Sequence, residues 1–249
     1  MTVAPGTTVL QVEALRLRRG PRDVLRGVSL RVAAGEIVAL MGVSGAGKST
    51  ILRAAVALEA FHDGRITVGD ATLVPGPVPR ESQLRALRRQ VGMVFQQHAL
   101  FSHLSVVENI TLAPIHAGRV APDAAVREAM RLLELLGVAH RADAYPAQIS
   151  GGEAQRVAIA RALALDPPVL LMDEPTAALD PARRGALADS LRALAQSGRG
   201  LLVTTHDLAF AKEADRVVVM AEGEIVEEGP ARQTLEQPQH AATRALLDD

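Results

Sequence analysis

Residues 42–50 read GVSGAGKST and constrain the fold of this chain more than any other stretch, because they follow the apolar run 37–41 and precede a helical pattern. A buried strand, a glycine-rich turn and a helix N-terminus, in that order, form an anion-binding loop. The dinucleotide pattern G-x-G-x-x-G does not fit, since these glycines fall as G-x-x-G-x-G. A plain flexible loop is the alternative, but the chain has only two lysines and one of them is Lys48.

The side chains of this loop predict a phosphate site with a metal ion. Lys48 is placed to reach the β- and γ-phosphates of a nucleotide, and the hydroxyl of Ser49 is placed to ligate Mg²⁺. Glycine reaches backbone conformations closed to other residues, which lets successive N–H groups converge on one phosphate. The residues expected to bind the nucleotide are therefore Gly42, Ser44, Gly45, Ala46, Gly47, Lys48, Ser49 and Thr50.

Composition excludes several classes of protein. The formal net charge of −1 offers no basic excess for nucleic acid, so no nucleic-acid partner is expected. Without cysteine, the chain forms no disulfide and no thiolate metal site. No apolar run approaches the ~18 residues of a membrane helix, and no secretory signal is visible. We therefore expect a soluble cytoplasmic protein, for which any membrane role depends on docking.

Apolar strands separated by helices predict an α/β fold with a mostly parallel central sheet. The strands expected in this sheet are residues 37–41, 91–95, 169–172, 201–204 and 217–220. Near the N-terminus, an antiparallel part is predicted by alternating patterns at 9–17 and 28–32 and by a hairpin across 66–68 and 71–74. Helices are expected at residues 49–60, 81–89, 153–165 and 181–197.

Between residues 97 and 150 the pattern becomes helical, which predicts an insertion in the α/β chain. Ser105 and Glu108 form a capping-box sequence before an apolar stretch. Segment 123–136 places four apolar residues on one helical face, namely Val126, Met130, Leu133 and Leu136. The chain is expected to form one domain, residues 1–249, with a core at about 1–96 and 151–249 and a helical subdomain at about 97–150.

Two carboxylates follow the apolar strand 169–172, at the edge where open α/β sheets bind ligands. Asp173 is expected to hold Mg²⁺ through water, beside Ser49. Glu174 is expected to polarise an attacking water as a general base. An acid pair that merely caps a strand is the alternative, which the nearby phosphate loop disfavours.

His206 and Gln96 also follow strands that end at this edge. His206 comes after strand 201–204, which places it beside the expected γ-phosphate. Gln96 ends strand 91–95 where the helical insertion begins, so its amide can contact Mg²⁺ or water and report phosphate occupancy to the insertion. Both are predicted as catalytic residues together with Glu174.

Ser150, Gly151 and Gly152 place a hydroxyl and glycine amides at the start of a second helix. One nucleotide bound by one lysine-bearing loop does not need two anion-binding ends. The economical interpretation is that the second end serves the nucleotide of another subunit, which gives two equal composite sites under two-fold symmetry. An ordinary glycine-containing helix N-terminus is the alternative.

These motifs, in this order and at this spacing, resemble those of the ATP-binding subunits of ABC transporters over nearly the whole chain. In chain order they resemble Walker A at 42–50, the Q-loop at Gln96, the signature motif at 149–153, Walker B with its catalytic glutamate at 169–174, the D-loop at 178–180 with Asp180, and the switch histidine at His206. The resemblance implies the P-loop NTPase (ABC ATPase) fold with a RecA-like core, and ATP and Mg²⁺ as cofactors.

Three further segments, 91–97, 100–104 and 210–216, resemble the ABC subfamily that imports polar amino acids. The resemblance implies an ATP-hydrolysing homodimer on the cytoplasmic face of a bacterial membrane. It also implies two permease subunits as partners and, indirectly, an external solute-binding protein. In such a dimer Ser150, Gly151, Gly152 and Glu153 contact the ATP held by the second subunit.

The chain departs from the family pattern at three positions. The signature motif has Ile149 in place of the usual Leu and Glu153 in place of Gln. Arg19 stands where the family stacks an aromatic residue on adenine, and residues 13–24 contain no aromatic residue. Arginine can stack on a purine as a cation over its π face, so Arg19 is included among the expected nucleotide-binding residues.

Two other classes of function remain open at this stage. One is a soluble ABC ATPase without a permease, for example of the iron–sulfur cluster assembly type, and only segment 97–105, which resembles a permease-docking surface, argues against it. The other is a regulatory nucleotide-binding module that does not hydrolyse ATP. The presence of both Glu174 and His206 disfavours that module.

Overall fold

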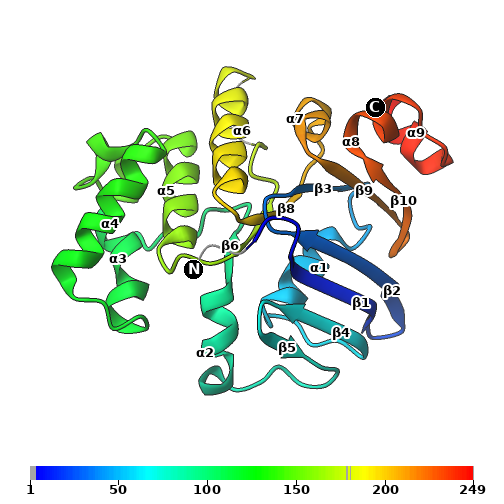
Figure 1. The fold of residues 1–249 in the computed structure, drawn as a ribbon, viewed down its shortest axis with the longest axis horizontal. Helices are drawn as coiled ribbons and strands as arrows, with labels where there is room; N and C mark the ends of the chain where they lie inside the picture. The colour runs from blue at the N-terminus through cyan, green and yellow to red at the C-terminus, as the bar shows by residue number, and fades with distance from the viewer. Residues whose placement is uncertain (1–3, 178, 180, 249) are drawn as a thin grey trace.

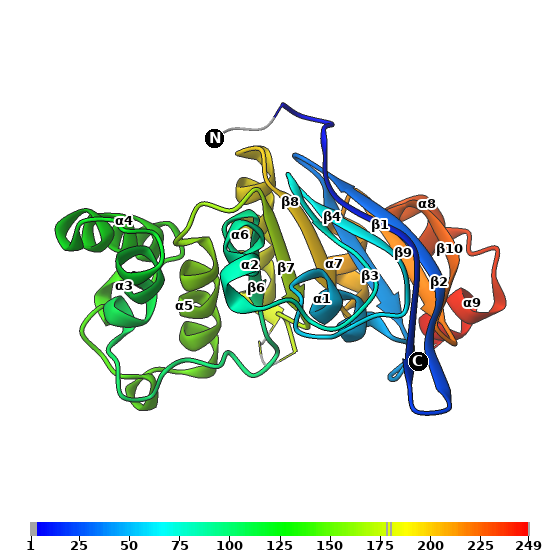
Figure 2. The ribbon, with the colours of Figure 1, turned by 90° about the horizontal axis from the view of Figure 1, so that it is seen from below.

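The strands of the chain form two sheets, and helix α1 (Lys48–Ala55) packs between them (Figures 1 and 2). This computed structural model describes residues 4–177, 179 and 181–248. A group of helices lies beside the sheets and forms a separate lobe in both views. The expected α/β fold is confirmed.

The N-terminal sheet is antiparallel, with the strand order β2-β1-β4-β5. Alternate apolar side chains along its two long strands are buried against α1, as expected for a sheet with one covered face. A turn at Gly20 and Pro21 places Arg19 and Arg22 opposite each other at the end of the first hairpin. The strands are β1 (Thr8–Arg19), β2 (Arg22–Ala33), β4 (Asp63–Val68) and β5 (Ala71–Leu73).

The central sheet has the order β10-β9-β3-β8-β7-β6 and is parallel except for β10, which confirms the expected mostly parallel sheet. Its three middle strands are buried along their whole length, because helices or the other sheet cover both faces. The strands are β3 (Ile37–Gly42), β6 (Val91–Val94), β7 (Val169–Asp173), β8 (Gly200–Thr204), β9 (Arg216–Ala221) and β10 (Glu224–Pro230).

Helices cover the face of the central sheet that α1 leaves open (Figure 1). They are α5 (Gly151–Leu163), α6 (Pro181–Gln196), α7 (Leu208–Glu213), α8 (Ala231–Glu236) and α9 (Ala241–Asp248). Helix α2 (Glu81–Gln90) packs its buried leucines against the core that contains α1. Among the described residues, no helix is both long and apolar enough to cross a bilayer.

The helical lobe contains α3 (Val106–His116) and α4 (Pro122–Leu135), which pack on α5. The Ser105–Glu108 capping box forms as predicted, with a hydrogen bond in each direction. The predicted buried face of α4 is partly wrong, because Val126 is 42% exposed. Small side chains at Ala125 and Ala129 are buried instead.

The predicted ends of α1 and α5 differ from the structure, where α5 ends at Leu163 and not at residue 165. Helix α1 stops at Ala55, not near residue 60, because Ala57 adopts a left-handed φ of 53°. The amides of Ala57 and Leu58 then bond back to the carbonyls of Ala54 and Arg53, which is the Schellman pattern normally signalled by glycine. Helix α5 begins at Gly151, two residues before the predicted start, because Ser150 is its cap.

Candidate nucleotide site

The phosphate loop connects β3 to α1, and two of its glycines are required by close packing. Gly42 has a φ of 143°, and a Cβ there would lie 2.3 Å from the carbonyl oxygen of Met220. Gly47 caps α1 with a φ of 105°, and a Cβ there would lie 2.7 Å from a methyl carbon of Leu25. The loop is therefore held against β9 and β2 in a shape that a larger residue would disrupt.

Lys48 is nearly buried, with 7% of its surface exposed. Its ammonium group donates hydrogen bonds to the carbonyl oxygens of Gly42 and Val43, so the lysine folds back along its own loop. Burial lowers the pKa of Lys48, although the carboxylates of Glu174 and Asp173 act in the opposite direction. The cation thus faces the two acids expected from the sequence.

Asp173 ends β7 and is 6% exposed, and its oxygen Oδ1 accepts two hydrogen bonds. One comes from the hydroxyl of Ser49 at 2.9 Å, and the other from the hydroxyl of Thr204 at 2.8 Å. The first places Ser49 of α1 and Asp173 of β7 in direct contact. The second was not predicted, since a threonine in an apolar strand carries no sequence signal of its own.

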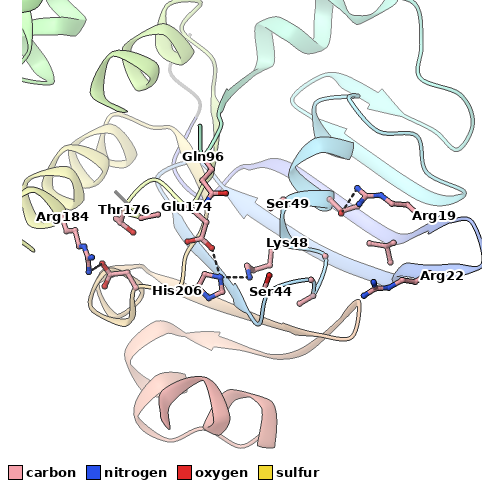
Figure 3. A pocket seen from close by; sticks show the side chains of 17 residues that line it. Arg19, Arg22, Ser44, Lys48, Ser49, Gln96, Glu174, Thr176, Arg184 and His206 are labelled. Atoms are coloured by element: carbon pink, nitrogen blue, oxygen red, sulfur yellow. Dashed lines mark hydrogen bonds and ion pairs between the residues drawn. The ribbon is translucent and has the colours of Figure 1, made fainter. Parts of the chain in front are cut away.

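Glu174, His206 and Lys48 form a row of polar contacts across the mouth of the site (Figure 3). Nε2 of His206 lies 3.0 Å from Oε1 of Glu174 and 3.3 Å from Nζ of Lys48. If Nε2 carries the ring hydrogen it donates to Glu174, and if it does not it accepts from Lys48. The imidazole therefore bridges the expected base and the expected phosphate-binding cation.

These groups line an open cleft of about 700 Å³. Figure 3 shows Gln96 and Glu174 on one side and the phosphate loop with Lys48 on another. Most residues expected to bind nucleotide belong to the lining, except Gly42. Asp173, an expected metal residue, is not part of the lining either, but it contacts Ser49, which is. The lining residues expected from the sequence are Arg19, Ser44, Gly45, Ala46, Gly47, Lys48, Ser49, Thr50, Gln96, Glu174 and His206.

Further lining residues were not predicted. Arg184 of α6 reaches the cleft and donates hydrogen bonds to the carbonyl of Leu179 at 2.9 Å and to Asp207 at 3.4 Å. Its exposed charge resembles any other helix-surface arginine in the sequence, so periodicity offers no signal. The remaining unpredicted residues of the lining are Arg22, Val24, Thr176, Ala177 and Asp207. Asp180, which was assigned to the D-loop, lies outside the described residues.

Arg19 reaches the cleft from the β1–β2 hairpin (Figure 3), but its guanidinium is engaged by Glu59. Nε and one terminal nitrogen each lie 2.7 Å from a carboxylate oxygen of Glu59, in a two-point pair. The same terminal nitrogen is 3.5 Å from the hydroxyl of Thr50. Arg19 therefore presents a paired guanidinium plane to the site, not a free cation.

The Ser150–Gly152 end does not belong to this cleft. Ser150 and Gly151 are exposed, and the Ser150 hydroxyl accepts from the amide of Glu153. Glu153 is held inward by the guanidinium of Arg141 at 2.8 Å and by the amide of Ser150 at 2.8 Å. These contacts lower the pKa of Glu153 to about 2, with the hydrogen bond from Arg141 as the main cause. Its carboxylate thus builds the turn, while Ser150 and Gly151 face outward.

The chain matches the ABC transporter family over residues 25–177. It is 44% identical to the arginine/ornithine transport ATP-binding protein of Pseudomonas aeruginosa over 246 residues, which cover 96% of this chain and 97% of that protein. It is 42% identical to the glutamine transport ATP-binding protein of Bacillus subtilis, over 92% of this chain and 93% of that protein. The L-cystine transport system ATP-binding protein of Escherichia coli is 41% identical, over 97% and 98%.

Solved structures of ATP-binding cassettes have the same fold. One is a dimer in a post-hydrolysis state bound to ADP and Pi, with a TM-score of 0.81 and 31% identity. The match covers 90% of this chain and 99% of that one.

Proposed function

This chain belongs to the ABC transporter family, as an ATP-binding subunit, and on that premise we propose that it hydrolyses ATP to drive uptake of a polar amino acid through a separate membrane permease. The observation that carries the proposal is the row of Lys48, His206 and Glu174 over a cleft that also contains the phosphate loop. A lysine for phosphate, a carboxylate base and a bridging imidazole are what hydrolysis of a phosphoanhydride requires.

Glu174 acts as the general base that polarises the attacking water. Its carboxylate is largely shielded, with 14% of the side chain exposed, and it opens onto the cleft. His206 holds this carboxylate in place and contacts Lys48, so it senses the phosphate end of the site. Gln96 lines the same cleft at the end of β6, where its amide can order water.

The donor set at the phosphate end fits Mg²⁺. The hydroxyl of Ser49 and the carboxylate of Asp173 are already in contact, and the amide oxygen of Gln96 opens onto the same cleft. All three are hard oxygen ligands, which this ion prefers over nitrogen or sulfur. When bound, Mg²⁺ neutralises charge on the β- and γ-phosphate oxygens.

The functional unit in this proposal is a homodimer. Ser150 and Gly151 are exposed at the start of α5 and lie outside their own cleft, so they are free to approach the ATP of a second copy. A related cassette, 31% identical, is a dimer in its solved structure. Closure of two such sites around ATP would draw the helical lobes, residues 97–150, toward each other and pass the movement to the permease.

The substrate proposal rests on the relatives and on segments 91–97, 100–104 and 210–216. Relatives that match over nearly the whole chain are named for transport of arginine, glutamine or cystine, all polar amino acids. These names favour transport over a soluble ATPase of the iron–sulfur cluster assembly type. The proposed location is the cytoplasmic face of the cell membrane, with the permease and, indirectly, an external solute-binding protein as partners.

The proposal is tested by Glu174→Gln, which keeps the shape of the side chain and removes the base. ATP hydrolysis should fall by about 100-fold or more, since a general base contributes that much. ATP binding should persist and should trap the dimer, which size-exclusion chromatography with ATP detects. Glu134→Gln on the exposed side of α4 is the matched control. Hydrolysis near the wild-type rate would remove Glu174 from the catalytic role.

A further inference from the structure

We propose that Thr204 is a positioning residue, which joins the two acids of the ATPase site through one hydroxyl group. Thr204 ends β8, next to β7, and its register partner across the parallel pair is Asp173. The side chain is fully buried. The inference rests on the proposed hydrolysis of ATP and names a residue that no motif in the sequence singles out.

The hydroxyl of Thr204 acts both as a hydrogen-bond donor and as an acceptor. It donates its one hydrogen to Oδ1 of Asp173 at 2.8 Å, and its oxygen accepts the backbone N–H of Glu174 at 2.9 Å. A hydroxyl has a single hydrogen, so donation to Asp173 fixes its direction and leaves a lone pair for Glu174. One atom therefore sets the position of both neighbouring acids.

The backbone of Glu174 needs such a restraint. Its φ of 51° lies in the left-handed region, which side-chain-bearing residues occupy at a cost and keep only when the surroundings hold them there. The amide of Glu174 bonds to the Thr204 hydroxyl and, at 3.2 Å, to the Thr204 carbonyl. This conformation turns the Glu174 side chain toward His206 and the cleft.

Asp173 needs the same hydroxyl for a different reason. Its Oδ1 accepts from both Ser49 and Thr204. Ser49 lines the cleft and is the expected metal ligand, so its hydroxyl has two partners to serve there: a lone pair for the metal and its hydrogen for Oδ1. Thr204 lies on the buried side of the acid, away from the cleft lining, and remains as the fixed donor.

The test compares Thr204→Val and Thr204→Ser in the full-length chain. Valine keeps the branched shape and removes the hydroxyl, whereas serine keeps the hydroxyl. We expect Thr204→Val to lower kcat for ATP by about tenfold, the effect of one buried hydrogen bond to a charged group, with KM changed less than about twofold. Thr204→Ser should recover most of kcat.

A second measurement uses protein without nucleotide or metal. Hydrogen exchange of the Glu174 amide should become faster in Thr204→Val and stay near wild type in Thr204→Ser, because only valine removes its hydroxyl acceptor. Thr111→Val on α3 is the matched control, a buried threonine outside the cleft, and it should leave both kcat and this exchange unchanged.

The outcomes separate this inference from the proposed function. Wild-type kcat and wild-type exchange in Thr204→Val would overturn the role of Thr204 while hydrolysis itself stands. Equal losses in the valine and serine variants would show that packing matters and the hydroxyl does not, which also overturns it. A wild-type protein that fails to hydrolyse ATP would instead contradict the function from which the inference starts.

Discussion

Lys48 and Glu153 both lie in the first turn of a helix, yet their surroundings act on their charges in opposite ways. Burial lowers the pKa of Lys48, which disfavours its charged form. Hydrogen bonds from Arg141 and from the amide of Ser150 lower the pKa of Glu153, which favours its charged form. A bound anion would therefore stabilise the charged form of Lys48, whereas the charged form of Glu153 already has its hydrogen-bond partners within the chain.

Glu153→Gln should lower stability by about 1 kcal/mol at neutral pH, because it removes a charge-assisted hydrogen bond to a half-exposed arginine. The folded pKa of about 2 lies below the ordinary value of 4.5, so the charge stabilises the fold fully above pH 4.5. That contribution declines as pH falls from 4.5 toward 2. Urea unfolding of both proteins should show a constant difference above pH 5 that shrinks toward pH 3, and a difference that grows in acid would contradict the assignment.

Lys48→Met should abolish ATP binding while leaving the fold about as stable as the wild type, within roughly 1 kcal/mol. Methionine fills similar space, and the buried ammonium that burial disfavours is removed. Thermal unfolding without nucleotide, together with binding of a fluorescent ATP analogue, checks both parts. Lys212→Met, at the exposed end of α7, serves as the control for loss of a lysine.

Among the elements, the two sheets are joined by Arg216 at the start of β9. Its guanidinium, 16% exposed, pairs with Glu36 at 2.8 Å and with Glu228 of β10, and it also donates to the carbonyl of Arg31 in β2. This one side chain therefore connects the parallel and antiparallel sheets at an edge far from the cleft.

Arg216→Met should destabilise the protein by about 2–3 kcal/mol, because two carboxylates lose their partner in a shielded place. Arg232→Met is the comparison, since the Arg232–Glu213 pair is exposed at both ends and should contribute less than about 1 kcal/mol. Chemical unfolding of both variants at neutral pH measures the difference. Equal effects would mean that Arg216 does not link the sheets energetically.

For the whole molecule, the separation between the cleft and the Ser150 end implies that one copy holds only half of each proposed site. Lys48 and Glu174 line the cleft, whereas Ser150 and Gly151 are exposed outside it. In a symmetric dimer, the cleft of each copy would face Ser150 and Gly151 of the other copy. Neither copy would have to change its fold.

Mixing Lys48→Ala with Ser150→Arg subunits tests this arrangement. Each variant alone should be inactive. In a mixed dimer the intact Lys48 of one copy meets the intact Ser150 of the other, so one composite site is rebuilt. Random pairing gives about half mixed dimers, and hydrolysis should appear only on mixing. An inactive mixture would argue against the role of Ser150 in the second copy's site.

The local sequence pattern alone was enough to predict many of the strands and the loop before α1. The apolar runs identified the buried strands, the spacing of Gly45, Gly47 and Lys48 predicted a loop that opens a helix, and the two acids were expected at the end of the strand that forms β7. These predictions succeed because a strand, a tight turn and a helix cap each depend on residues within a few positions of one another.

Contacts between distant segments decided the rest. The pairing of Arg19 with Glu59, the end of α1 at a left-handed Ala57, and the inward face of α4 depend on neighbours that no local pattern reveals. Thr204 is the clearest case, because its hydroxyl gains two partners only when β7 and β8 pair in register. The partners of a side chain depend on how strands and helices pack against each other. The free energy of that packing comes from contacts throughout the folded chain, so no short segment encodes it.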